Sequence, residues 1–209
     1  MFNRQLLSQT TFDKLAQTYS NKFTYNKTER EKLESLLKTW RLKKGDTVLE
    51  LGGGTGDLSP FIIKKIGSKG SLVFLDFSPK MIQKAQSKLK KFPNIAFINI
   101  DIHNYHQNQL FDKIVIFNTF PHFADKKKAL TNCYKALKPK GKLIICHNES
   151  RSSICLHHSK KLIENQISSF PDDQTVLALL AKIGFIVELF ENNEGYDYYL
   201  LIASKSSKL

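Results

Sequence analysis

The chain of 209 residues has few cysteines and no long apolar run. Its three cysteines, Cys133, Cys146 and Cys155, are odd in number and form no C-x-x-C pair, which disfavours a disulfide framework and indicates reduced thiols. No apolar stretch approaches the ~20 residues that a membrane span needs. The N-terminus also lacks the apolar region of a signal peptide. We therefore expect a cytoplasmic protein with no membrane span.

Arginine is also scarce, although the chain is strongly basic. The formal net charge is +13, but only four of the 32 basic residues are arginine. Arginine is the better side chain for bidentate contacts to phosphates and bases, and the lysines are scattered over expected helix faces and loops. Nucleic acid therefore stays open as the less favoured partner. The C-terminal Ser207-Lys208-Leu209 matches a peroxisomal address, which a tail rich in lysine and serine also produces by chance.

A glycine-rich turn follows an expected buried strand at Thr47–Leu51. The glycines stand at alternate positions: Gly52, Gly54 and Gly56. Glycine lets the backbone turn sharply with no Cβ in the way. A helix should begin next, capped by Asp57 or Ser59, with Pro60 in its first turn. A strand, a glycine turn and a helix N-terminus in this order allow a ligand to contact the backbone.

Acidic residues occur near the ends of three successive expected strands. The strands are 47–51, 71–76 and 95–101, and their acids are Glu50, Asp76 and Asp101. The carboxyl ends of parallel strands meet at one edge of an open α/β sheet, where ligands bind. An acid at the end of the second strand can accept both ribose hydroxyls of a nucleoside. We therefore expect one crevice bordered by the three acids and the glycine turn.

These motifs resemble those of the class I S-adenosylmethionine (SAM) methyltransferases. Residues 50–56 match the family's motif I, E/D-x-G-x-G-x-G, whereas Ser59 stands where a dinucleotide fingerprint needs its third glycine. The resemblance implies that SAM is the cofactor and that the glycine turn packs against its methionine part. It also implies that Glu50 holds the amino group of SAM, that Asp76 binds the ribose, and that Asp101 and the backbone of Ile102 bind the adenine.

Further residues carry the same resemblance. The segment 76–81 matches the family's D-x-S-x-x-M, which implies that Met81 packs on the adenine and that Phe77 lies in the cofactor site. Asn118 follows the fourth expected strand and is also expected to contact the cofactor. Tyr19 ends an F-D-x-x-A-x-x-Y segment that often lies over the cofactor in this family. Ordinary core packing of Met81, and a plain amphipathic helix around Tyr19, stay open as alternatives.

The resemblance covers residues 12–204, and the chain is similar to the ubiquinone/menaquinone-biosynthesis type of methyltransferase. It implies a Rossmann-like α/β fold, a doubly wound, mostly parallel seven-stranded sheet in three αβα layers. The implied strand order is 3-2-1-4-5-7-6, with the seventh strand antiparallel. We expect a single domain over residues 1–209, in which 1–40 form a helical lid and 148–172 a substrate-side insertion. A capping box is expected at 28–31, and Lys140 replaces a usual glycine in an exposed turn, where we expect it to be harmless.

Histidines gather on the side where the resemblance places the methyl acceptor. His122 follows the fourth expected strand, His147 ends the fifth, and His157 and His158 come soon after. An imidazole can deprotonate an acceptor near neutral pH, and His147 is the first choice for such a base, with His122 second. Alternatively, His122, His147 and His157 hold a metal ion with Glu149 as an oxygen ligand, or the histidines have no chemical role.

The favoured function is therefore a SAM-dependent methyltransferase with a small-molecule acceptor. The segment 118–123 departs from the N/D-P-P-Y/F motif of amine and nucleobase N-methyltransferases, which disfavours a nucleobase as the acceptor. Three alternatives stay open: a methyltransferase acting on nucleic acid or protein, a metal-assisted methyltransferase, and a SAM-binding protein without turnover. The sequence identifies neither the acceptor atom nor the oligomeric state.

Overall fold

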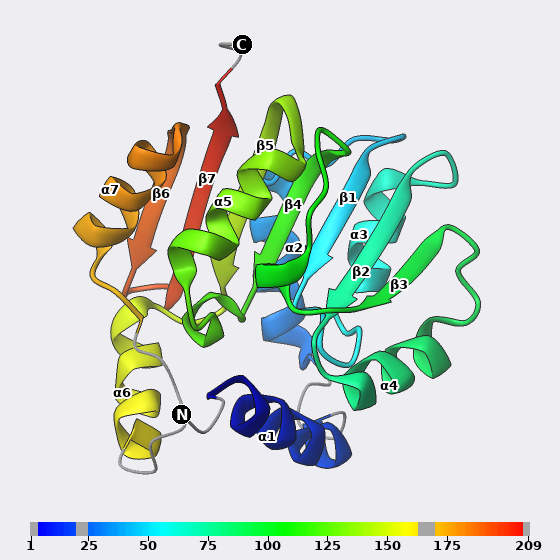
Figure 1. The fold of residues 1–209 in the computed structure, drawn as a ribbon, viewed down its shortest axis with the longest axis horizontal. Coiled ribbons are helices and arrows are strands. Elements are labelled where there is room, and N and C mark those ends of the chain that lie inside the picture. The colour runs from blue at the N-terminus through cyan, green and yellow to red at the C-terminus, as the bar shows by residue number, and fades with distance from the viewer. Residues whose placement is uncertain (1–3, 20–24, 163–169, 207–209) are drawn as a thin grey trace. The chain divides into compact units, whose positions relative to one another are not determined.

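The computed structural model describes residues 4–19, 25–162 and 170–206, and the side chains of residues 9–16, 25–156 and 170–206. The side chains of Tyr19, His157 and His158 and the terminal residues 207–209 lie outside this part, as do the predictions made for them. The chain divides into two compact units, Met1–Asn104 and Tyr105–Leu209. Helices alternate with strands in both units (Figure 1).

The first unit begins with two helices and continues with three strands. Its elements are α1 (Arg4–Tyr19), α2 (Lys27–Thr39), β1 (Thr47–Leu51), α3 (Ser59–Ile66), β2 (Ser71–Asp76), α4 (Pro79–Leu89), β3 (Ile95–Asn99) and the short 3-10 helix η1 (Ile102–Asn104). Strand β2 pairs in parallel with both β1 and β3. Helix α1 packs against α4.

The second unit begins with two parallel strands and ends in a hairpin. Its elements are β4 (Phe111–Phe117), the 3-10 helix η2 (Phe120–His122), α5 (Lys126–Ala136), β5 (Leu137–His147), α6 (Arg151–Leu162), α7 (Asp173–Ile183), β6 (Phe185–Asn193) and β7 (Tyr198–Lys205). Strand β7 runs antiparallel to both β5 and β6. The strand order of the seven-stranded sheet is β3-β2-β1-β4-β5-β7-β6, which confirms the predicted topology.

The core of each unit consists of strand residues that are buried at consecutive positions. Fully buried residues in the first unit include Val48, Leu49, Leu72 and Phe74, and in the second unit Ile114, Val115, Ile116, Leu143, Ile144 and Ile145. Parallel strands covered on both faces show such continuous apolar runs rather than alternation. The strand ends therefore carry most of the polar groups that are available for chemistry.

Helix α2 begins slightly earlier than predicted. The capping box is formed by Asn26 and Glu29 rather than by residues 28–31: the Asn26 side chain accepts a 2.9 Å hydrogen bond from the Glu29 N–H, and the Glu29 carboxylate accepts one of 2.9 Å from the Asn26 N–H. Asparagine caps helices at least as well as threonine, and the N-x-x-E spacing satisfies the same two backbone donors.

Two further local predictions need correction. Strand β3 ends at Asn99, so Asp101 follows the strand instead of ending it. Lys140 has a φ of +63°, which lies in the left-handed region that favours glycine. The glycine usual in this family's turn therefore has a conformational reason, and lysine at this position carries a backbone cost.

Candidate functional site

The glycine turn after β1 is hydrogen-bonded to, and packs closely against, the end of β2. Its glycines have positive φ values of 70° at Gly52, 58° at Gly54 and 80° at Gly56. The Gly52 N–H donates a 2.7 Å hydrogen bond to the carbonyl of Leu75. A Cβ at Gly53 would stand 2.2 Å from the Phe74 ring, whereas a Cβ at Gly54 would meet nothing within 4 Å. The turn therefore lies tightly on β2 at Gly53 and presents bare backbone to open space at Gly54.

Glu50 is a buried acid directly before this turn, with 2% of its surface exposed. Its carboxyl group accepts a 2.6 Å hydrogen bond from the hydroxyl of Ser59, and among the described residues no cation pairs with it. Burial raises the pKa of Glu50 to about 8, the bond from Ser59 lowers it in part, and the neighbouring Asp57 and Asp76 raise it further. An ammonium group placed beside Glu50 would relieve this cost.

Ser59 is a site residue with a function that the sequence did not reveal. It was predicted as a possible helix cap together with Asp57, and both predictions are wrong, because Leu58 takes the N-cap position without a side-chain hydrogen bond. The Ser59 hydroxyl is directed to Glu50 instead. The Asp57 carboxylate accepts hydrogen bonds from Thr55 and from the Lys88 ammonium group. The prediction that Pro60 stands in the first turn is confirmed.

Asp76 ends β2 and organises two neighbouring turns. One carboxylate oxygen accepts a hydrogen bond from the Gly54 N–H and the other accepts one from the Ser78 N–H, both of 2.9 Å. The residue is 5% exposed, so this strand-end carboxylate is nearly enclosed. Burial raises the pKa of Asp76 to about 6, backbone hydrogen bonds lower it, and the nearby Asp13 raises it.

The N-terminal end of α4 forms the next part of the site. The Ser78 hydroxyl accepts a hydrogen bond of 3.2 Å from the Met81 N–H and so caps helix α4. Met81 is 2% exposed. The same hydroxyl donates to the carboxylate of Asp13 on α1. Helix α4 is fixed on β2 by Ala85 and Leu89, which pack against Phe74.

Helix α1 contacts the turn between β2 and α4 through three side chains. Gln9 donates a 3.3 Å hydrogen bond to the carbonyl of Phe77, the Phe12 ring meets the Phe77 ring edge-on at 5.4 Å, and Asp13 accepts from Ser78. Phe12 and Asp13 are the first two residues of the F-D-x-x-A-x-x-Y segment, so that motif contacts the turn that carries Asp76. No local sequence pattern indicates the role of Gln9.

The residues after β3 continue the site. A backbone N–H and a ring nitrogen of His103 lie 2.8 Å and 2.5 Å from one carboxylate oxygen of Asp101. Ile102 is 4% exposed and begins η1. The Asn99 side chain donates a 2.9 Å hydrogen bond to the carbonyl of Asp76, so the ends of β2 and β3 are tied together. The hydrogen bonds made by His103 and Asn99 were not predicted from the sequence.

In the second unit, Asn118 joins the ends of β4 and β5. Its N–H donates a 3.0 Å hydrogen bond to the carbonyl of Cys146, and its side-chain oxygen accepts one of 3.0 Å from the Asn148 N–H. Its φ of 53° is uncommon for a residue other than glycine, although asparagine tolerates this region better than most. Such a backbone persists where surrounding bonds hold it, and it occurs often at functional sites.

His147 ends β5 inside a cluster of aromatic rings. It is 3% exposed, and its ring lies 5.2 Å from the ring of Phe170 and 6.2 Å from that of Tyr199. Phe170 also contacts Phe120 of η2, at 5.8 Å between ring centroids. His122 closes η2 and is partly buried. Within the described side chains no three His, Cys, Asp or Glu residues form a group that could hold a metal ion.

The start of α6 is bonded to the turn that joins β6 and β7. The carboxylate of Asp197 accepts 2.8 Å hydrogen bonds from the Ser150 N–H and from the Ser153 hydroxyl. The Arg151 guanidinium donates a 2.8 Å hydrogen bond to the carbonyl of Pro171. These contacts anchor both ends of the segment that the sequence assigned to the substrate side, residues 148–172.

Known proteins share this arrangement. The chain matches the family model of the methyltransferase domain over residues 42–196. It is 30% identical over 192 residues to malonyl-[acyl-carrier protein] O-methyltransferase 1 of Ilyobacter polytropus, which covers 87% of this chain and 70% of that protein. It is 29% identical over 170 residues to the ubiquinone/menaquinone biosynthesis C-methyltransferase of Methylococcus capsulatus, which covers 69% of this chain and 68% of that protein.

A solved structure shows the same fold. The N-methyltransferase NodS of Bradyrhizobium japonicum, in complex with S-adenosyl-L-homocysteine (SAH), superimposes with a TM-score of 0.68 at 20% identity over 88% of this chain and 90% of that one. Strand order, glycine turn and strand-end acids thus define a Rossmann-like class I methyltransferase whose cofactor is SAM. The chain belongs to the methyltransferase domain family and is similar to the ubiquinone-biosynthesis type within it. In the part of the chain that is described, no helix is long and apolar enough to cross a membrane.

Proposed function

We propose that the chain transfers the methyl group of SAM to a carbon or oxygen atom of a small-molecule acceptor. The observation that carries this proposal is the aromatic enclosure at the end of β5, where His147 is buried beside Phe170 and Tyr199. Sites for small ligands are lined mostly by apolar and aromatic side chains with a few polar groups among them. The two relatives described above are named for O- and C-methylation, which supports acceptors of this kind.

The residues of the first unit fit the cofactor. Glu50 is a buried carboxyl group that lacks a cationic partner among the described residues, and an ammonium group is the ligand that would favour its ionised form. Gly54 offers backbone without a Cβ beside the Asp76 carboxylate. In this proposal Glu50 holds the amino group of SAM, Asp76 the ribose hydroxyls, and Asp101 with the Ile102 backbone the adenine.

The remaining cofactor contacts follow from the same assignment. The turn at Gly52, Gly54 and Gly56 lies along the methionine part, Met81 and Phe77 border the adenine, and Asn118 contributes from the end of β4. Tyr19 is proposed as a lid residue over the cofactor. We also propose that residues 1–209 act as one domain, with 1–40 as the lid and 148–172 on the substrate side.

The chemistry requires little covalent work from the protein. SAM supplies a methyl group that is already activated by its positive sulfur. The chain holds donor and acceptor in line, which is worth ~7–11 kcal/mol when both are well oriented. A base is needed only when the acceptor loses a proton, and His147 is proposed for that role, with His122 as the second candidate.

A labelled-methyl assay tests the proposal. Purified protein is incubated with SAM carrying a labelled methyl group and with a cell extract separated by size into small molecules, nucleic acid and protein. We expect label in the small-molecule fraction, and much less label with Asp76→Asn protein at the same SAM concentration. Label confined to the nucleic-acid or protein fraction would assign a macromolecular acceptor. Binding of SAM without any label transfer would identify a binding protein instead.

A further inference from the structure

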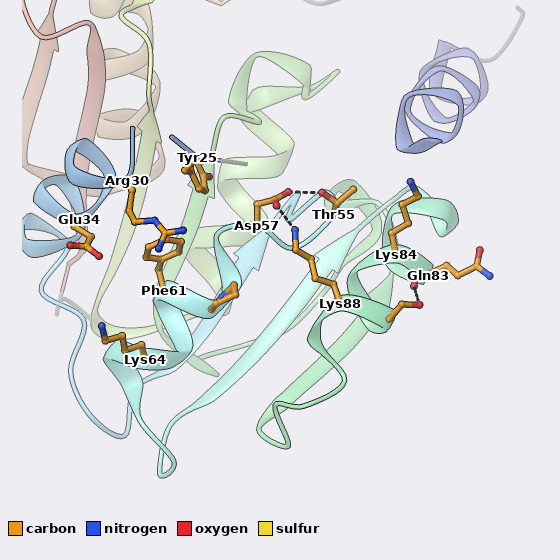
Figure 2. A pocket seen from close by; sticks show the side chains of 12 residues that line it. Tyr25, Arg30, Glu34, Thr55, Asp57, Phe61, Lys64, Gln83, Lys84 and Lys88 are labelled. Carbon is orange, nitrogen blue, oxygen red and sulfur yellow. Dashed lines mark hydrogen bonds and ion pairs between the residues drawn. The ribbon is translucent and has the colours of Figure 1, made fainter. Parts of the chain in front are cut away.

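A groove of about 1120 Å³ in the first unit is not used by the proposed function (Figure 2). It lies between helices α2, α3 and α4, and none of the acids assigned to SAM lines it. Figure 2 shows Arg30, Phe61 and Lys64 on one side and Lys84 and Lys88 on the other. The groove is therefore separate from the cofactor residues, although it borders the glycine turn at Thr55.

The groove carries an excess of positive charge. Four cationic side chains line it, against the two carboxylates of Glu34 and Asp57. Asp57 already has two partners: its carboxylate accepts a hydrogen bond from Thr55 and forms an ion pair with Lys88. Taken together, the side chains that line the groove carry a formal excess of two positive charges. Cations on two facing walls attract an anionic ligand more strongly than scattered surface charges do.

Aromatic rings form the other part of the lining. The edge of the Tyr25 ring meets Phe61 at 6.0 Å between centroids, with the ring planes at 85°. The Arg30 guanidinium lies 6.0 Å from the centre of the same Phe61 ring. A guanidinium over an aromatic ring makes a planar surface that can stack on another planar group. The groove therefore combines cations with a stacking surface.

We propose that this groove binds a nucleotide, either free or within a single strand, with its phosphates at Lys64 and Lys84 and its base against Phe61 and Tyr25. Proteins that hold single-stranded nucleic acid combine a cationic groove with aromatic rings in this way. An acidic peptide would use the cations but would gain little from the rings. The ring contacts therefore favour a nucleotide over an acidic protein partner.

Binding measurements on the full chain saturated with SAH test the inference, since SAH fills the cofactor site and prevents nucleotides from entering it. The probes are ADP, a short oligothymidylate, pyrophosphate and polyglutamate. We expect ADP or the oligothymidylate to bind more tightly than pyrophosphate, with binding weakened by salt. Tighter binding of ADP assigns a free nucleotide, and tighter binding of the oligothymidylate assigns a strand.

Variants locate the site and separate charge from stacking. Lys64→Ala combined with Lys84→Ala should weaken nucleotide binding ~10-fold. The matched control, Lys128→Ala with Lys182→Ala, removes the same charge from exposed positions on α5 and α7 and should have little effect. Phe61→Leu, checked for unchanged thermal unfolding, should weaken ADP or strand binding by about fivefold or more while leaving pyrophosphate binding unchanged.

Three results would overturn the inference. The first is equal loss of binding in the groove pair and the control pair, which would show a general charge effect. The second is polyglutamate binding as tightly as the nucleotides with no effect of Phe61→Leu, which would assign the groove to an acidic protein. The third is no binding of either nucleotide probe at low salt.

Discussion

The hydroxyl of Ser59 donates a 2.6 Å hydrogen bond to the carboxyl group of Glu50, and both residues are almost completely buried. Ser59 is the first residue of α3, and Glu50 lies in β1 on the other side of the glycine turn. The hydrogen bond therefore joins the two segments that flank the glycine turn, the end of β1 and the start of α3. It also supplies the one described neighbour that stabilises the ionised form of Glu50 by a side-chain hydrogen bond.

Glu50 should destabilise the cofactor-free protein at alkaline pH. Its pKa is raised from 4.5 to about 8 in the folded chain, so between these pH values the folded state binds more protons than the unfolded state. Stability then falls as pH rises through this window. Glu50→Gln removes the titrating group and should raise the free energy of unfolding by ~1–3 kcal/mol at pH 8.5, with little gain at pH 4.5. Urea unfolding at both pH values measures the difference.

The same substitution should weaken SAM binding, because glutamine cannot pair with an ammonium group through a charge. A stabilised Glu50→Gln protein that still binds SAM normally would contradict the proposed role of the carboxylate. An equal gain in stability at both pH values would show that the gain does not come from ionisation. Calorimetry with SAM and with SAH completes the comparison.

Ser59→Ala should move the pH dependence of SAM binding to higher pH. The hydrogen bond from Ser59 lowers the pKa of Glu50, so its loss raises that pKa further. At pH 7 the variant has to release a proton that costs more, so its SAM affinity should fall by ~1–2 kcal/mol relative to the unchanged protein, and this difference should shrink toward pH 9. Ser59→Thr, which keeps the hydroxyl, is the control. A uniform loss of affinity at every pH would indicate that Ser59 acts only through packing.

The glycine turn and the strand-end acid Asp76 were predictable because each leaves a local pattern, whereas the strand order was implied by the resemblance to a known family. Gly52, Gly54 and Gly56 need positive φ values, and Asp76 directly follows the apolar run of β2. Contacts between residues distant in sequence left no such pattern. The pairs of Gln9 with Phe77 and of Asp13 with Ser78 join positions more than sixty residues apart. The position of Ser59, three residues after Gly56, also predicts a helix cap. Only the folded structure shows that its hydroxyl donates a hydrogen bond to Glu50 instead.

Substitutions at Asp76 should affect both the cofactor and the fold. Asp76→Ala leaves the Gly54 and Ser78 N–H groups without an acceptor, which costs ~1–3 kcal/mol of stability. Asp76→Asn retains one acceptor oxygen and should lose less. Both variants should lose ~2–4 kcal/mol of SAM binding, because the ribose loses charge-assisted hydrogen bonds. Chemical unfolding and calorimetry measure the two effects separately, and equal stability of the two variants would disprove the role in holding the turns.

Lys140→Gly should stabilise the protein by ~0.5–1 kcal/mol, because a φ of +63° costs lysine energy that glycine avoids. Lys140 is exposed, so its side chain contributes little packing. Lys140→Ala serves as the control, since it removes the charge but keeps the Cβ, and it should give no gain. Thermal unfolding at several salt concentrations distinguishes the two effects. A similar gain in both variants would attribute the change to charge.

His147 can be tested as a base without emptying its aromatic enclosure. His147→Gln keeps much of the volume and a polar end group, whereas His147→Ala would leave a cavity between Phe170 and Tyr199. If His147 removes a proton from the acceptor, His147→Gln should lower turnover by ~10²–10⁴-fold with SAM affinity unchanged. His122→Gln, assayed in parallel, provides the comparison on η2. Normal turnover in His147→Gln with a loss in His122→Gln would move the base to η2, and normal turnover in both would show that methyl transfer here needs no histidine base.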